Sequence, residues 1–259
     1  MYQFPPLKDC RILVTNDDGY NAPGIKALER VAKSLSKDVW IVAPETEQSG
    51  AGHSLTLTEP LRLRKVSARK YAVKGTPTDC VMMAINQVMQ DRRPDLILSG
   101  INRGGNLAED VTYSGTVAAC MEGTMFDIPS IALSQSFANR KVLHMATAEQ
   151  HAGGIIKKLV AVGWHRNVLI NVNFPDVPPD QVKGVELVRQ GLRDFSGLAM
   201  EYRIDARDQP YYWIGFRPAS GAPKRKSDLG AVEAGYIAVT PLHLDLTAER
   251  ALRRLRDAF

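Results

Sequence analysis

The chain has 259 residues, of which 44% are hydrophobic and 24% are charged, which suits one α/β domain or two smaller domains with a sizeable core. Its net charge of +5 is small and spread along the chain, so it lacks the dense basic face of a dedicated nucleic-acid binder. The sequence shows no signal-peptide core, no membrane-spanning apolar run and no disulfide or zinc pattern among its three cysteines, so we expect a cytoplasmic protein.

Short apolar, β-branched runs alternate with helix-like segments over the first two thirds of the chain. Apolar residues at helical spacing, together with Thr76 or Thr78 and Ser114 as capping residues, predict helices over 22–36, 76–90, 114–126 and 147–163. Runs bounded by Gly, Pro or Asp predict strands over 11–16, 38–44, 71–75, 94–100, 129–135 and 167–175. The alternation predicts an α/β fold with a mostly parallel sheet that helices cover on both faces.

This alternation ends after about Gly191. Residues 199–216 predict two antiparallel strands around a turn, and 221–230 predict a polar loop. A strand within 235–247 and an amphipathic helix at 248–259 follow. Leu252, Leu255 and Phe259 share one face of that helix, which we expect to pack on the body of the protein.

We expect a single domain over residues 1–259. Its core would comprise about 9–190 and 231–247, with a protruding C-terminal antiparallel hairpin and loop at about 191–230 and the helix at 248–259. A two-stranded ribbon is marginally stable by itself. The hairpin is therefore a candidate for exchange with a partner.

Two adjacent acids, Asp17 and Asp18, follow the first predicted strand within ILVTNDDGYNAPG. Ligands of open α/β sheets bind beyond the carboxyl ends of strands, and neighbouring carboxylates repel unless a cation or hydrogen bonds compensate them. Their hard oxygens suit Mg²⁺ or Mn²⁺ better than zinc. The simpler alternative is a turn, because Asn and Asp are ordinary turn residues before Gly.

A loop rich in small residues follows the second predicted strand, within PETEQSGAGHSLT. Backbone N–H groups in such a loop can approach an anion closely, and Ser49 adds a hydroxyl. A plain surface loop explains the same composition. His53 is interpreted as a polar loop residue rather than a proton-transfer group.

The most informative stretch is LILSGINRGGNLAEDVTYSGTVAACMEG. A polar, glycine-rich loop with Asn102 and Asn106 leads to a helix whose start holds Ser114, Gly115 and Thr116. A helix N-terminus presents unpaired N–H groups and partial positive charge, which suit a phosphate. Capping alone explains Ser114, but it does not explain a loop longer than the roughly 2–6 residues usual for such connections.

The three segments follow three different strands, and the carboxyl ends of parallel strands share one edge of a sheet. A metal site would therefore face an anion site. A phosphate-ester hydrolase needs this arrangement, because the metal polarises the phosphoryl oxygen and lowers the pKa of bound water. The helix N-terminus would stabilise the charge of the transition state.

Five motifs in this order resemble the SurE family of nucleotide phosphatases. They are ILVTNDDGYNAPGI, VAPETEQSGAGHSLT, GTPTDCV, DLILSGINRGGNLAEDVTYSGTVAACMEG and GYIAVTPLHLDLT. The resemblance extends from about Arg11 to Thr247. It implies a Rossmann-like fold, a metal-dependent phosphatase acting on nucleoside monophosphates (a 5′-nucleotidase), a cytoplasmic location and a homodimer or homotetramer.

The resemblance also implies roles for single residues. It implies one divalent metal ion per subunit, Mg²⁺ or Mn²⁺, bound by Asp17, Asp18, Ser49 and Asn102. It implies phosphate binding near Asn106, Ser114, Gly115 and Thr116. Asp17 and Asp18 are the catalytic candidates: either one of them accepts the proton of the attacking water, or Asp17 acts as a covalent nucleophile. Arg103 stands where relatives often have a small residue, and we expect it to point to solvent.

Alternatives from other classes remain. A receiver-type signalling domain also carries an acid pair after its first strand, but it needs an acceptor aspartate after the third, and 71–75 is not followed by one. A nucleotide-binding regulator would keep the site without turnover. A Rossmann dehydrogenase is disfavoured because no GxGxxG follows the first strand. The aromatic residues of 211–213 either stack on a nucleobase or pair within the hairpin. No stable complex with nucleic acid or membrane is expected.

Overall fold

The computed structural model describes residues 1–137, 145–193, 198–216, 226–256 and 258–259. Within these ranges one large sheet is formed by β1 (Arg11–Thr15), β2 (Asp38–Pro44), β3 (Arg62–Ser67), β4 (Lys70–Lys74), β5 (Leu96–Arg103), β6 (Ser130–Gln135), β7 (Val168–Phe174), β8 (Val185–Leu187) and β11 (Ile237–His243). The helices are α1 (Pro23–Leu35), α2 (Pro77–Met83), α3 (Gly115–Met125), α4 (Met145–Val162), α5 (Asp228–Glu233) and α6 (Glu249–Arg256). Shorter turns of helix are η1 (Leu7–Asp9), η2 (Ala84–Val88), η3 (Ala108–Thr112) and η4 (Pro179–Gln181).

The large sheet is mostly parallel, which confirms the predicted fold class. Its strand order is β3-β4-β2-β1-β5-β6-β7-β11-β8, and only the β3–β4 and β7–β11 pairs are antiparallel. The chain progresses from β1 to one side through β2 and β4, and then returns to the other side of β1 with β5, β6 and β7. The switch point lies between β1 and β5, where open α/β sheets place their ligands.

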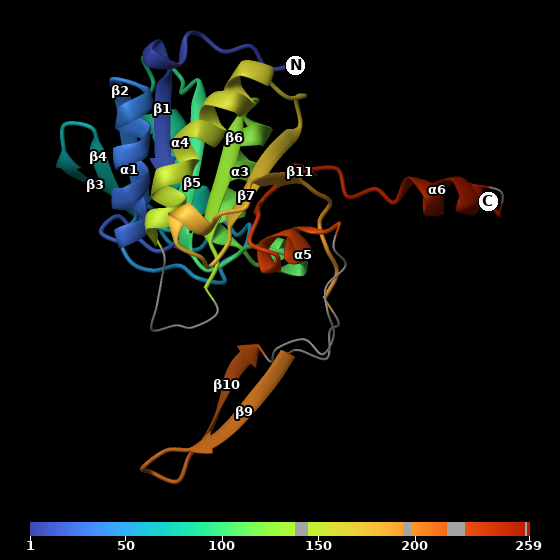
Figure 1. Ribbon diagram of the computed structural model, residues 1–259. Coiled ribbons are helices and arrows are strands. Elements are labelled where there is room, and N and C mark those ends of the chain that lie inside the picture. Colours follow the sequence, from blue (N-terminus) through green and yellow to red (C-terminus); the bar gives the residue numbers. More distant parts are fainter. Residues whose placement is uncertain (138–144, 194–197, 217–225, 257) are drawn as a thin grey trace.

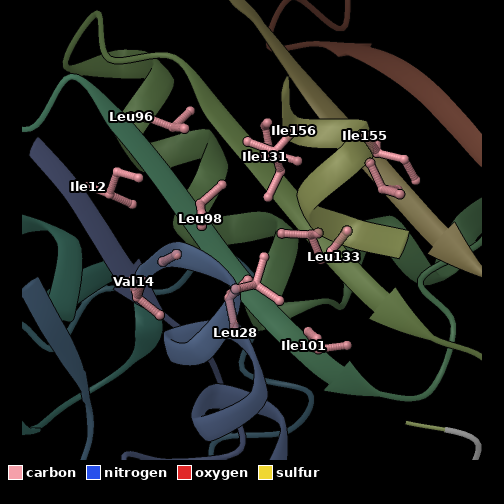
Figure 2. Close-up of a cluster of buried hydrophobic side chains, with 14 of the residues drawn as sticks. Ile12, Val14, Leu28, Leu96, Leu98, Ile101, Ile131, Leu133, Ile155 and Ile156 are labelled. Atoms are coloured by element: carbon pink, nitrogen blue, oxygen red, sulfur yellow. The ribbon is translucent and has the colours of Figure 1, made fainter. Parts of the chain in front are cut away.

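Helices cover both faces of the sheet (Figure 1). Side chains of a strand alternate between faces, so Ile12 and Val14 of β1 face α1 and α4, whereas Leu13 faces α2 and α3. Figure 2 shows the first of these layers, in which Leu28 of α1 and Ile156 of α4 lie with the isoleucines and leucines of β1, β5 and β6. Burial on both faces explains why the central strands are continuously apolar.

Local signals placed several helix starts correctly. The Thr76 hydroxyl accepts the N–H of Asp79 at 3.1 Å, and the Asp79 carboxylate accepts the N–H of Thr76 at 2.8 Å, which makes a reciprocal capping box. Pro77 occupies the first turn of α2, and Ser114 caps α3 by accepting the N–H of Val117 at 3.1 Å. The helix predicted over 76–90 is α-helical only as far as Met83. From Ala84 to Val88 the chain continues as the π-helical turn η2.

The sequence pattern missed β3, β8 and α5. Strand β3 (RLRKVS) is exposed along its whole length and carries charges at the sheet edge, so it shows no apolar alternation. The polar loop predicted over 221–230 is wrong at its end, because Ser227 caps α5 and Asp228 begins it. Residues 221–225 of that prediction lie outside the described residues.

The predicted hairpin is formed by β9 (Leu198–Ile204) and β10 (Pro210–Phe216), which pair with each other and project from the body (Figure 1). The turn between them closes with the N–H of Asp205 donating to Gln209 O at 2.9 Å. Tyr202 and Tyr212 pair edge to face, with ring centroids 5.5 Å apart, and Tyr211 lies near Trp213. The aromatic residues therefore pair within the hairpin.

The prediction that the C-terminal helix packs on the body is wrong. Helix α6 extends away from the sheet (Figure 1), and Leu252 and Leu255 on its apolar side are 37% and 55% exposed. The amphipathic pattern indicates that the helix has an apolar side, but it does not specify which surface covers that side. No helix in the described part of the chain is both long enough and apolar enough to span a membrane.

Candidate functional site

The loops that follow β1, β2 and β5 meet at the carboxyl edge of the sheet because these strands are neighbours. The N–H of Gln48, in the loop after β2, donates to Asp17 O at 2.8 Å. The N–H of Arg103, at the end of β5, donates to Asp18 Oδ2 at 3.3 Å. The Thr116 hydroxyl in α3 donates to Asp17 Oδ1 at 2.5 Å. All three loops and α3 therefore converge on the two aspartates.

The two aspartates lie in a place that disfavours their charge. Asp17 is 4% exposed, and burial raises its pKa despite the hydrogen bond from Thr116. Burial and the neighbouring Asp17 carboxylate raise the pKa of Asp18 to about 6. The charge of Glu47 raises both pKa values further, and the sequence patterns had not singled this residue out. Two adjacent, largely buried carboxylates, with a third acid near enough to act on them, favour a cation at this place.

The remaining predicted metal ligands carry oxygen atoms suited to such a cation. Ser49 is exposed, and its hydroxyl donates to Glu47 Oε1 at 2.9 Å. Because Ser49 is the donor, this bond leaves the lone pairs of its oxygen available to a cation. Asn102 donates from its amide nitrogen to Gly104 O at 3.0 Å, and this bond does not use its amide oxygen. Within the described residues no three His, Cys, Asp or Glu side chains form a metal cluster. The donor set fits a hard cation bound by two carboxylates with hydroxyl and amide oxygens.

The start of α3 lies against the first aspartate. Neighbouring atoms pack tightly around Gly115: an added Cβ would lie 2.7 Å from the Cβ of Asp17 and 2.9 Å from the Cγ of Pro77. The first turn of α3 contains no acidic residue, so no carboxylate of the helix itself offsets the partial positive charge at its start, although Ser114 caps the N–H of Val117. Ser114 accepts its capping bond, which leaves the hydroxyl proton for another acceptor. Of the predicted phosphate-binding residues, Gly115 and Thr116 thus lie beside Asp17, and Ser114 directly precedes them.

Asn106 occupies a different position from these three residues. It is buried, its N–H donates to Asn173 Oδ1 at 2.8 Å, and its amide nitrogen donates to Ser134 Oγ at 2.8 Å. Its carbonyl oxygen accepts from the amides of Asn171 and Asn173. Asn106 therefore anchors the loop to β6 through its side chain and to β7 through its backbone. The contact of Asn106 with phosphate stays a prediction.

Two further polar residues lie near the site. Arg103 is exposed, as expected, and its guanidinium carbon is 6.0 Å from the ring centroid of Phe137. Its charge lowers the pKa of Asp18, although less than burial and Asp17 raise it. His53 Nε2 lies 3.0 Å from Glu122 Oε2 on α3, which fastens the loop after β2 to that helix. This contact fits the interpretation of His53 as a loop residue.

The same loop is fastened at its far end by α2. The Thr56 hydroxyl donates to Asp79 Oδ2 at 2.6 Å, and the Thr56 N–H donates to Asp79 Oδ1 at 3.2 Å. The Thr76 hydroxyl donates to Ser54 O at 2.8 Å. Asp79 stands in the GTPTDCV motif, where the sequence indicated only a helix start. Its second role requires Thr56, which a local pattern does not reveal.

Comparison with known proteins gives a consistent result. A sequence model of the family described as "Survival protein SurE" matches residues 12–197. A protein from Parvibaculum lavamentivorans named "5'-nucleotidase SurE" is 57% identical over 97% of this chain and 91% of its own length. A protein of the same name from Paramagnetospirillum magneticum is 57% identical over 99% of both chains.

The fold agrees with a solved structure as well. The crystal structure of the SurE protein from Aquifex aeolicus matches with a TM-score of 0.83 at 41% sequence identity, over 95% of this chain and 98% of that one. The similarity therefore extends over nearly the whole chain and is not limited to the aspartate motif.

Proposed function

This chain belongs to the SurE family, and from that membership we propose that it is a 5′-nucleotidase, a phosphomonoesterase that hydrolyses nucleoside monophosphates to nucleoside and phosphate. The names of its relatives support the activity. The observation that carries the proposal is the contact between Asp17 and the start of α3, where Thr116 donates to the carboxylate at 2.5 Å. That contact joins an acidic site to a helix N-terminus suited to phosphate.

We propose that Asp17, Asp18, Ser49 and Asn102 hold one divalent cation, Mg²⁺ or Mn²⁺. Such an ion, when bound, would supply a Lewis acid that polarises the phosphoryl oxygen. Ser114 and the N–H groups at the start of α3 would hold the equatorial phosphate oxygens as charge shifts during in-line attack by water. These groups come from rigid elements, because Ser114 and Thr116 are buried.

Asp18 is the better candidate for the group that accepts the proton of the attacking water. Its side chain is more exposed than that of Asp17, one oxygen of which already accepts from Thr116. The alternative, a covalent phospho-aspartate, would appear as rapid formation of an acid-stable protein-bound phosphate before steady-state turnover.

The decisive experiment measures phosphate release from a panel of nucleoside monophosphates, with EDTA and then with added Mg²⁺ or Mn²⁺. We expect release that EDTA abolishes and added metal restores, and a loss of roughly 100-fold or more in Asp17→Asn and Asp18→Asn. Asp38→Asn is the matched control, because Asp38 pairs with Arg11 at the opposite end of β2. Nucleotide binding without release by the wild type would instead indicate a nucleotide-binding regulator.

We further propose that the chain forms a homodimer or homotetramer. Large apolar side chains on the hairpin support this, among them Met200 and Ile214, which are 74% and 71% exposed. Helix α6 adds Leu252 and Leu255. An isolated two-stranded ribbon with both faces in water is marginal, and a second copy would cover it.

A further inference from the structure

A buried carboxylate from the far end of the sequence holds the loop that leads to α3. Asp228, in α5, is 0% exposed. Its Oδ2 accepts the N–H of Ala108 at 2.9 Å, and its Oδ1 accepts the N–H groups of Gly191 and Leu229, each at 2.8 Å. Hydrogen bonds from N–H groups to a charged acceptor are among the stronger ones in proteins.

The residue that Asp228 holds has an unfavourable backbone conformation. Ala108 has φ = 51°, in the left-handed region that residues with a Cβ rarely adopt. Such a conformation is unfavourable and persists only where the surroundings impose it. Gln190 contributes as well, because its amide nitrogen donates to Ala108 O at 2.8 Å. Both backbone polar atoms of Ala108 are thus held by side chains from the C-terminal part of the chain.

Ala108 begins the turn that ends at the candidate phosphate site. It is the first residue of η3, and the N–H of Tyr113 donates to Asp110 O at 3.0 Å just before Ser114 caps α3. On the other side of Ala108, Asn106 is anchored to Asn173. The N–H of Arg193 also donates to Glu109 Oε2 at 2.9 Å. The loop therefore has one anchor on β7 and a second on the segments that flank the hairpin.

We propose that Asp228 is a positioning residue for the phosphate-binding end of α3. It fixes Ala108 in its left-handed conformation, and this sets the position of η3 and of Ser114. The inference rests on the proposed phosphatase function, although Asp228 is not among the residues proposed to bind substrate or metal. It predicts that loosening Ala108 weakens phosphate binding and leaves metal binding at the aspartates intact.

The substitution Asp228→Asn tests this with almost no change in volume. If the amide nitrogen takes the place of Oδ2, it faces the N–H of Ala108, and two donors oppose each other. If it takes the place of Oδ1, it faces the N–H groups of Gly191 and Leu229. Either orientation loses at least one bond, and an unsatisfied buried donor is destabilising.

Three quantities separate a positioning role from a merely structural one. They are the KM for a nucleoside monophosphate, the inhibition constant of inorganic phosphate, and the dissociation constant of Mn²⁺ measured by spin resonance without substrate. We expect kcat/KM to fall roughly 10- to 100-fold, as for displaced binding groups generally. The inhibition constant of phosphate should rise about tenfold, with Mn²⁺ affinity within about twofold of wild type. Simple partial unfolding would lower kcat and the number of Mn²⁺ sites without moving KM or the inhibition constant.

Asp38→Asn serves as the matched control, because it removes one carboxylate bonded to Arg11 at the other end of the sheet. Gln190→Ala is the second variant: Gln190 is exposed, so its removal should be tolerated, and it should raise the phosphate inhibition constant in the same direction by a smaller factor. If Asp228→Asn does not fold, the phosphate inhibition constant of Gln190→Ala tests the proposal instead.

Wild-type phosphate binding in folded Asp228→Asn overturns the proposal, and so does wild-type binding in Gln190→Ala where Asp228→Asn does not fold. Loss of phosphate binding in a variant supports it even if the wild type releases no phosphate from nucleotides, and in that case only the proposed function fails. The two failures are therefore distinguishable.

Discussion

Gly115 lies where the start of α3 meets the loop after β1. A Cβ at this position would lie 2.7 Å from Asp17 and 2.9 Å from Pro77, closer than atoms can pack. The missing side chain is what allows the helix N-terminus to lie directly against the first aspartate. The distance between the candidate metal and phosphate sites therefore depends on one hydrogen atom in place of a methyl group.

We predict that Gly115→Ala lowers kcat/KM by roughly tenfold or more, because the start of α3 must move away from Asp17. It should also destabilise the protein by about 1–3 kcal/mol through overpacking, although alanine is the better helix former by about 1 kcal/mol. Steady-state kinetics and urea unfolding measure the two effects.

The control is Gly154→Ala in α4, where an added Cβ meets no atom within 4 Å. There the helix preference acts alone, so we expect a gain of about 0.5–1 kcal/mol with unchanged kinetics. An active Gly115→Ala variant that is as stable as Gly154→Ala would contradict the close contact.

At the scale of elements, the loop after β2 is irregular and yet firmly held. Its Gln48 N–H bonds to Asp17 O, its His53 contacts α3, and its Thr56 bonds to Asp79 of α2. The candidate ligand Ser49 lies between the first two of these anchors. Residues outside the ligand set thus fix the part of the loop that a cation would use, as supporting hydrogen bonds commonly do at metal sites.

We predict that Asp79→Asn weakens Mn²⁺ binding by roughly tenfold, in the range typical of such supporting residues. It should also lower the stability of the metal-free protein by about 1 kcal/mol, because the capping box of α2 loses its carboxylate. Isothermal titration with Mn²⁺ and urea unfolding give the two values.

Thr56→Val separates the two effects, since it removes one hydroxyl donor to Asp79 and leaves the capping box in place. It should weaken Mn²⁺ binding less than Asp79→Asn does and leave the start of α2 intact. Mn²⁺ affinity equal to that of the wild type in Asp79→Asn would rule out this role for the loop anchor.

At the scale of the whole molecule, two segments leave the body and carry apolar side chains into solvent. They are the β9–β10 hairpin and α6 (Figure 1). Trp213 is 60% exposed and Leu255 is 55% exposed. In a folded protein, exposed apolar surface of this kind marks a site of interaction with another molecule.

We predict that sedimentation at micromolar concentration gives a species larger than the 28.5 kDa of one chain. Replacing Trp213 and Ile214 together by serine should weaken the assembly, because both side chains are largely exposed in the single chain. The control is Val162→Ser at the end of α4, which is also exposed but lies away from the hairpin. A 28.5 kDa species for the unaltered chain would refute the proposal.

The sequence by itself determined the features that short-range physics controls. Continuous apolar runs indicated strands buried on both faces, and Thr76, Pro77 and Ser114 marked helix starts through bonds within a single turn. The parallel sheet followed from the alternation of these elements. The convergence of Asp17, Ser49 and Asn102 at one edge followed from the parallel sheet.

Only the tertiary structure decided the contacts that join distant parts of the chain. Asp228 bonds to Ala108, and Asn173 bonds to Asn106, yet each looks locally like an ordinary polar residue. The sequence pattern likewise did not predict that Asn106 points inward or that α6 is exposed. The physical reason is that helix and strand signals arise from neighbours in sequence, whereas the partner of a buried polar group or an apolar face is chosen by packing across the whole fold.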